Sequence, residues 1–242
     1  MQIIKADEYQ GWVIKTRDEF IAVDPWLTDH QKFPSSGFLL NRASESKHFL
    51  NHSDNIQHVT HLIITAHFSD HLDKASLEKF DRSIPILTTH IAKKTLVKMG
   101  FKDITVVKPD SSYSLNHSQI HVMKSGKPYQ STSFAYVLQN DEGSIFHEGH
   151  IFNQKLIESL NQYKLDLLIL TGDLVKVFGM IKVSMDVSDA LLIKKNISAK
   201  YIAITGNHPN KFRGLIANFL YYKNSTTDQP LVCRKAWQSL II

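Results

Sequence analysis

Short runs of apolar and β-branched residues recur along the chain, with polar turns between them. Such runs are typical of strands, and we expect strands at 2–5, 12–15, 20–23, 62–64, 84–88, 104–107, 113–115, 119–123, 133–139, 144–147, 165–170 and 201–204. Helical spacing, an N-cap residue or a closing glycine predicts helices at 74–80, 90–99 and 186–195, and a further helix at 212–222. This mixture of strands and helices predicts an α/β fold.

Residues 28–57 interrupt the pattern, because they show neither strand nor helix periodicity. A connection of this length inside a compact domain is often a functional lid. The alternative is a disordered insertion that carries surface histidines. Phe38, Leu39 and Phe49 favour the lid, since a freely solvated segment rarely holds so many large apolar side chains.

Composition sets the remaining limits. The 242 residues are 43% hydrophobic and 21% charged, which suits one globular domain over 1–242. The net charge of +5 comes from scattered lysines, so no nucleic-acid-binding stripe is predicted. The single cysteine, Cys233, excludes an internal disulfide and every multi-cysteine zinc motif. No membrane-spanning run or signal peptide is visible, and we expect a cytoplasmic protein.

The most informative stretch is the predicted strand that ends at Thr65 and is followed by Asp70-His71. It resembles the signature of the metallo-β-lactamase superfamily, a strand followed by T-H-x-H-x-D-H. Thr65, Asp70 and His71 match this pattern, whereas the first two histidine positions hold Ala66 and Phe68. His67 lies between them, one place out of register. In an extended segment that offset turns the side chain to the opposite face, so His67 is assigned a supporting role only.

Four further motifs follow the family's order. Asp24-Pro-Trp-Leu27 resembles a family segment that ends a strand beside the metal. There Asp24 would orient a ligand histidine through a hydrogen bond. The alternative is that Asp24 only begins a turn. Lys127 stands where the family often places a histidine ligand. Gly149-His150 replaces the usual Gly-Asp, and Asn207-His208 resembles the final ligand motif. Asp173 ends another predicted strand and could face the same site.

The resemblance implies a four-layer αββα sandwich of two mixed sheets flanked by helices. It also implies that the first of the family's two metal sites is lost, because its positions hold Ala66, Phe68 and Lys127. The second site is retained as Asp70, His71, His150 and His208, with His150 in place of the family's bridging Asp. All four can ligate a metal, and the ligand types favour zinc, with manganese, iron, nickel or cobalt as alternatives.

These residues predict a metal-dependent hydrolase of a small, anionic substrate with one divalent ion. Asp70 would act in catalysis as well as ligation, Glu148 would be a general acid or base, and Lys127 would bind an anion or stabilise an oxyanion. Four tetrahedral ligands would instead make a closed, structural site. The alternative function is a non-catalytic binding or scaffold protein with the same fold. Nucleic-acid processing is less expected, and association into a homo-oligomer is left open.

Overall fold

The computed structural model describes residues 1–33, 36–44, 46–205, 212–223 and 230–242. Its larger sheet has seven strands in the order β19-β1-β2-β3-β6-β7-β8. Neighbouring strands are antiparallel from β19 to β3 and parallel from β3 to β8. The strands are β1 (Gln2–Lys5), β2 (Trp12–Lys15), β3 (Phe20–Val23), β6 (His61–Ile64), β7 (Ile86–Thr88), β8 (Ile104–Val106) and β19 (Ser239–Ile241).

The second sheet has six strands in the order β16-β13-β12-β11-β10-β9. Strands β12, β13 and β16 run parallel, and β9 to β12 are antiparallel. Both sheets are therefore mixed. The strands are β9 (Ser111–Ser114), β10 (Gln119–Lys124), β11 (Phe134–Asn140), β12 (Gly143–Glu148), β13 (Leu165–Thr171) and β16 (Ala199–Thr205).

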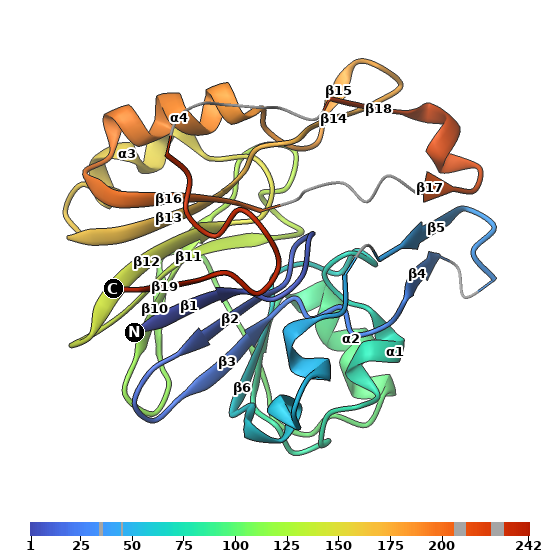
Figure 1. The fold of residues 1–242 in the computed structure, drawn as a ribbon, viewed down its shortest axis with the longest axis horizontal. Helices are drawn as coiled ribbons and strands as arrows, with labels where there is room; N and C mark the ends of the chain where they lie inside the picture. Colours follow the sequence, from blue (N-terminus) through green and yellow to red (C-terminus); the bar gives the residue numbers. More distant parts are fainter. Residues whose placement is uncertain (34–35, 45, 206–211, 224–229) are drawn as a thin grey trace.

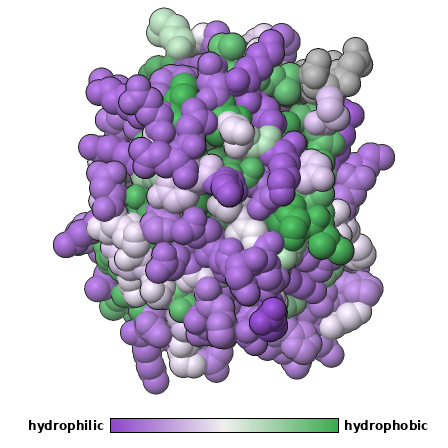
Figure 2. Space-filling view, turned by 90° about the vertical axis from the view of Figure 1, so that its left-hand side faces the viewer, coloured by the Kyte–Doolittle hydropathy of each residue, from purple (hydrophilic) through white to green (hydrophobic). Residues whose placement is uncertain are grey.

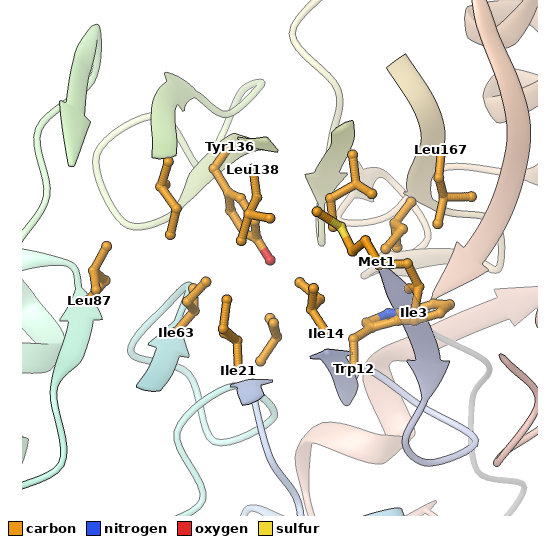
Figure 3. Packing of buried hydrophobic residues seen from close by; sticks show 14 of the residues in the cluster. Met1, Ile3, Trp12, Ile14, Ile21, Ile63, Leu87, Tyr136, Leu138 and Leu167 are labelled. Atoms are coloured by element: carbon orange, nitrogen blue, oxygen red, sulfur yellow. The ribbon is translucent and has the colours of Figure 1, made fainter. Parts of the chain in front are cut away.

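The two sheets pack face to face, and helices cover their outer faces (Figure 1). Figure 3 shows the centre of this core, where side chains of the larger sheet face those of the smaller one: Trp12, Ile14, Ile21 and Ile63 against Tyr136, Leu138 and Leu167. Alternate residues of the same strands point outward, to α1 (Lys74–Leu77) and α2 (His90–Lys98) on one side and to α3 (Ile157–Leu160) and α4 (Val187–Asn196) on the other. The predicted αββα sandwich is confirmed.

Two smaller sheets lie beside the sandwich, at the right-hand end of Figure 1. One contains β4 (His30–Phe33), β5 (Leu40–Ala43) and β17 (Phe212–Arg213), and the other contains β14 (Leu174–Val177), β15 (Ile181–Lys182) and β18 (Leu220–Lys223). The predicted helix at 212–222 is wrong: the segment forms β17, a short turn of 3₁₀ helix (η4, Ile216–Phe219) and β18. Gly214 explains the break, because its φ of +106° is not helical and a Cβ would lie 2.6 Å from the carbonyl oxygen of Leu39.

The predicted lid segment divides into two parts. The first part contains β4 and β5, and the later part contains two 3₁₀ helices, η1 (Phe49–Asn51) and η2 (Asn55–His58). The second part packs onto the sandwich, because Leu50 is buried in the cluster beneath α1 and α2. The β4–β5 hairpin instead belongs to one of the two smaller sheets. No helix in the described part of the chain has the length and hydropathy to cross a membrane.

Candidate functional site

The site begins where two parallel strands end side by side. Asp24 follows β3 and Thr65 follows β6, and these strands are neighbours in the larger sheet. The Asp24 carboxylate accepts hydrogen bonds from the Thr65 backbone N–H at 2.8 Å and from its hydroxyl at 2.5 Å. Asp24 has a φ of +45°, a left-handed conformation that Asp tolerates better than most residues and that turns the chain immediately before Pro25.

His71 is buried against this pair of residues. Its Nδ1 lies 2.8 Å from Asp24 Oδ2 and 2.9 Å from Thr65 Oγ1. Because a carboxylate only accepts hydrogen bonds, Nδ1 carries the proton in this arrangement. Nε2 is buried and has no hydrogen-bond partner among the described residues. Burial alone would lower the pKa of His71, but the carboxylates of Asp24 and Asp70 outweigh it and raise that pKa.

Asp70 lies on the other side of the His71 ring, with Oδ2 3.7 Å from Nε2. The Tyr9 hydroxyl donates to the same oxygen at 3.2 Å, and Nη1 of Arg42 lies 3.9 Å from it. Burial opposes ionisation of Asp70, but the positive charges of His71 and Arg42 outweigh it and lower its pKa to about 2. Asp70 is therefore a carboxylate at neutral pH and can accept hydrogen bonds or ligate a cation.

His150 follows β12 and stacks on His71, with ring centroids 4.4 Å apart and planes 19° from parallel. Tyr129 covers the His150 ring at 4.0 Å, and Phe68 meets it edge-on at 6.0 Å. Its Nδ1 lies 3.1 Å from the hydroxyl of Ser133. Burial lowers the pKa of His150, and the neighbouring His71 lowers it further, so His150 is neutral.

Glu148 is the last residue of β12 and is fully buried. Its Oε1 accepts the backbone N–H of His150 at 2.9 Å and lies 4.0 Å from His150 Nδ1. Burial raises the pKa of Glu148 to about 8. A protonated carboxyl group can therefore persist at neutral pH, which suits the predicted role of acid or base.

The other predicted residues are more dispersed. Lys127 is exposed and is not among the residues that line the cavity described below. His67 lines that cavity, with its ring 4.2 Å from that of Phe68. Asp173 is buried after β13, and its carbonyl accepts a hydrogen bond from the Ser184 hydroxyl. His208 lies outside the described residues.

The donors fit a metal ion only in part. His71 Nε2 and Asp70 Oδ2, 3.7 Å apart, have a separation that one ion with ligand distances near 2.1 Å could span. The Asp24–His71 hydrogen bond is the usual support of a metal-ligating histidine. Within the described ranges, however, no group of three His, Cys, Asp or Glu side chains is arranged to hold a metal ion. A third ligand would have to be supplied by a shift of His150 or by His208.

Sequence reasoning missed Tyr9, Arg42 and Tyr129. Arg42 lies in β5, with its guanidinium 4.3 Å from the centre of the Tyr9 ring and Nη1 donating to Gln31 Oε1 at 2.9 Å. Tyr9 belongs to the β1–β2 turn, and Tyr129 follows β10. None of the three stands in a motif, and only the tertiary fold brings them to Asp70 and His150.

Tyr9, Arg42, Asp70, Tyr129 and His150 lie together at the floor of a cavity of about 1150 Å³. Polar residues at the floor include Tyr9, Arg42, Asp70 and His150. The walls come from both small sheets and from α1, and they include several apolar side chains: Phe33, Leu40, Val175, Val177, Ile216 and Leu220. A cavity that combines apolar walls with a few polar groups is typical of a small-molecule site.

The family model described as "Beta-lactamase superfamily domain" matches residues 4–204. The chain belongs to the beta-lactamase superfamily. No curated protein matches the sequence. Solved structures of this fold include the isothiocyanate hydrolase from Delia radicum gut bacteria, which is 18% identical, with a TM-score of 0.69 over 87% of this chain and 88% of that one.

Two further structures are similar. A possible metal-dependent hydrolase from Veillonella parvula is 14% identical, with a TM-score of 0.68 over 86% of this chain and 87% of that one. The metallo-beta-lactamase fold protein YhfI from Bacillus subtilis is 15% identical, with a TM-score of 0.64 over 90% of both chains. At these identities the similarity shows a shared fold.

Proposed function

We propose that the protein is a metal-dependent hydrolase of a small, anionic substrate that works with one divalent metal ion. The observation that carries the proposal is the environment of His71. This buried imidazole has its Nδ1 fixed by Asp24, while its Nε2 has no hydrogen-bond partner among the described residues and lies 3.7 Å from Asp70 Oδ2. Leaving a buried polar atom unpaired is costly, and a bound cation would remove that cost.

The ion would be held by His71 and Asp70, with His150 and His208 as candidates for the remaining positions. A mixed nitrogen and oxygen set favours zinc and also accommodates manganese, iron, nickel or cobalt. A bound divalent metal supplies a Lewis acid and lowers the pKa of a coordinated water. Asp24 keeps the Nε2 lone pair of His71 directed at the site.

Other residues supply charge and a proton. Arg42 lines the cavity and lies 3.9 Å from Asp70, so it brings a positive charge to an anionic substrate. Lys127 is exposed and does not line the cavity, so Arg42 would take the anion-binding role expected of Lys127. Glu148, whose pKa is raised to about 8, can hold a proton near His150 at neutral pH.

Metal content and hydrolysis test the proposal together. Protein purified without chelator should carry close to one transition-metal ion per chain by inductively coupled plasma mass spectrometry. It should also hydrolyse members of a panel of carboxylate-bearing esters and lactones. His71→Ala should lose the metal and the activity, whereas His90→Ala, an exposed histidine at the start of α2, should keep both. Absence of bound metal from the unsubstituted protein would contradict the proposal.

The second candidate is a non-catalytic binding protein. The observation that favours it is that the described residues include no group of three metal-ligating side chains, although a large cavity is present. In that case His71→Ala would leave ligand binding intact, and no metal would be found before or after the substitution.

A further inference from the structure

The walls of the cavity differ in kind from its floor. Strands β4 and β5 pair Phe33 with Leu40, and strands β14 and β18 pair Val177 with Leu220. Residues paired directly across two strands lie on the same face of the sheet. All four of these side chains line the cavity, so each small sheet presents a cross-strand apolar pair to it.

The apolar surface continues along the walls. Val175 lies two residues before Val177 on β14, and alternation along a strand places both side chains on one face. Val175 and Ile216, the latter from the 3₁₀ turn η4, also line the cavity. A substrate that was polar throughout would leave this surface without a complementary partner.

The polar end of the cavity is fixed by the same elements. Arg42 lies two residues after Leu40 on β5, and therefore on the same face as the Phe33–Leu40 pair. Its guanidinium is near Asp70, as described above. One strand thus brings an apolar wall residue and a cation to the cavity, with the cation at the floor.

Exposed apolar side chains also lie beside one of the two walls. Phe178 and Phe219 have ring centroids 5.0 Å apart and are 59% and 44% exposed, and Met180 is 80% exposed. They lie next to the strands that form one wall. By contrast, the face opposite the two small sheets is mostly hydrophilic and shows its apolar residues in small, separated spots (Figure 2). Clustered exposed apolar side chains of this kind are typical of an interaction surface, whereas single scattered ones are ordinary.

We infer that the substrate is an amphiphile, with a medium-length or long acyl-type chain held between the Phe33–Leu40 and Val177–Leu220 pairs and an anionic or carboxyl-derived group at the Arg42 and Asp70 floor. This inference rests on the proposed function for the identity of the reacting end. The chain-binding part stands on the walls alone, which contain none of the proposed metal ligands.

The test compares two fatty-acid anions that differ only in methylene number, decanoate and butanoate. Their affinities for the purified full-length protein are measured by titration calorimetry, at concentrations where decanoate is monomeric. Burial contributes about fourfold in affinity per methylene, so the six additional methylenes of decanoate should make it bind at least on the order of 1,000-fold more tightly. Treatment with chelator should change both affinities together and preserve their ratio, because the carboxylate is common to the two acids.

Variants locate the chain. Leu220→Asp should lower decanoate affinity by tenfold or more and leave butanoate affinity within twofold. Leu192→Asp is the matched control, since Leu192 is 59% exposed on α4 and does not line the cavity. If Leu220→Asp fails to fold, Leu220→Ala replaces it, with an expected loss of about fivefold for decanoate alone.

Equal affinities for the two acids would overturn the inference, and so would an equal loss in the Leu192 and Leu220 variants. The result is independent of the hydrolase test. A preserved chain-length ratio without metal or turnover would leave the amphiphile site standing and refute the enzyme. Metal-dependent hydrolysis with equal affinities for the two acids would support the enzyme and refute the amphiphile site.

Discussion

Asp24→Asn separates the charge of the Asp24 side chain from its shape. In the native protein Oδ1 accepts from the Thr65 N–H at 2.8 Å, while Oδ2 faces both the Thr65 hydroxyl and His71 Nδ1. In the variant the amide oxygen should keep the backbone bond, so that the NH₂ group replaces Oδ2. That group can only donate, and His71 must then present an unprotonated Nδ1 and carry its proton on Nε2.

The expected consequence is a loss of metal affinity without collapse of the fold. Removing the carboxylate that supports a ligating histidine costs about 10- to 100-fold in affinity, or about 1.4–2.8 kcal/mol. Asn tolerates the left-handed φ of +45°, and all three contacts persist in neutral form, so the free energy of unfolding should fall by only about 1–3 kcal/mol. Asp24→Ala removes the contacts and should cost about 3–5 kcal/mol.

Three measurements follow the variant: ¹⁵N NMR of the imidazole nitrogens, titration calorimetry with Zn²⁺, and urea unfolding. Asp29→Asn provides the control, because Asp29 is an exposed carboxylate that lines the cavity and the substitution removes the same charge. Retention of the proton on His71 Nδ1 in Asp24→Asn would refute the reasoning whether or not metal binds. A Zn²⁺ affinity within twofold of the unsubstituted protein would refute the metal step.

Two buried carboxyl groups away from the floor should give opposite pH dependences of stability. Burial raises the pKa of Asp7 from 3.8 to about 6, so the folded protein binds this proton more tightly than the unfolded chain does. The free energy of unfolding should therefore fall by about 3 kcal/mol as the pH rises from about 4 to 6. Asp7→Asn should abolish that change in urea titrations. Burial would raise the pKa of Glu19, but hydrogen bonds from Ser118 and His117 outweigh burial and lower that pKa. Glu19 therefore stabilises the folded protein at a pH above the pKa that it has in the unfolded chain, and this stabilisation is lost on acidification. Glu19→Gln should reduce the loss of unfolding free energy at low pH, and an unchanged loss would contradict the role given to Glu19.

The sandwich could be predicted because its strands are buried on defined faces and carry that burial as sequence periodicity. Strands β6 and β13 are buried along their whole length and mostly apolar, and their predicted bounds agree with the structure to within a residue. The small sheets could not be found in this way. The sequence of β4, His-Gln-Lys-Phe, has one buried residue, and β15 has none, so their pairing depends on tertiary contact rather than on pattern.

The residues of the candidate site also fall into those that the sequence could predict and those that only the structure reveals. Asp24, Asp70 and His71 stand at strand ends or in the turn after β6, within a recognisable motif, and the structure brings them together. Tyr9 and Arg42 come from a turn and an edge hairpin remote in sequence. Their signal exists only in three dimensions, since each is defined by its approach to Asp70.

The positions that the family pattern gives to two further histidines now serve packing. Ala66 is fully buried and forms an isolated β-bridge with Ser133, whose hydroxyl lies 3.1 Å from His150 Nδ1. Phe68 packs edge-on against Tyr129 and His150. Both replacements therefore position His150 instead of offering a donor of their own. In the proposed one-metal arrangement, the residues at two first-site positions would therefore hold the ring of a candidate second-site ligand, and packing would link the loss of one site to the retention of the other.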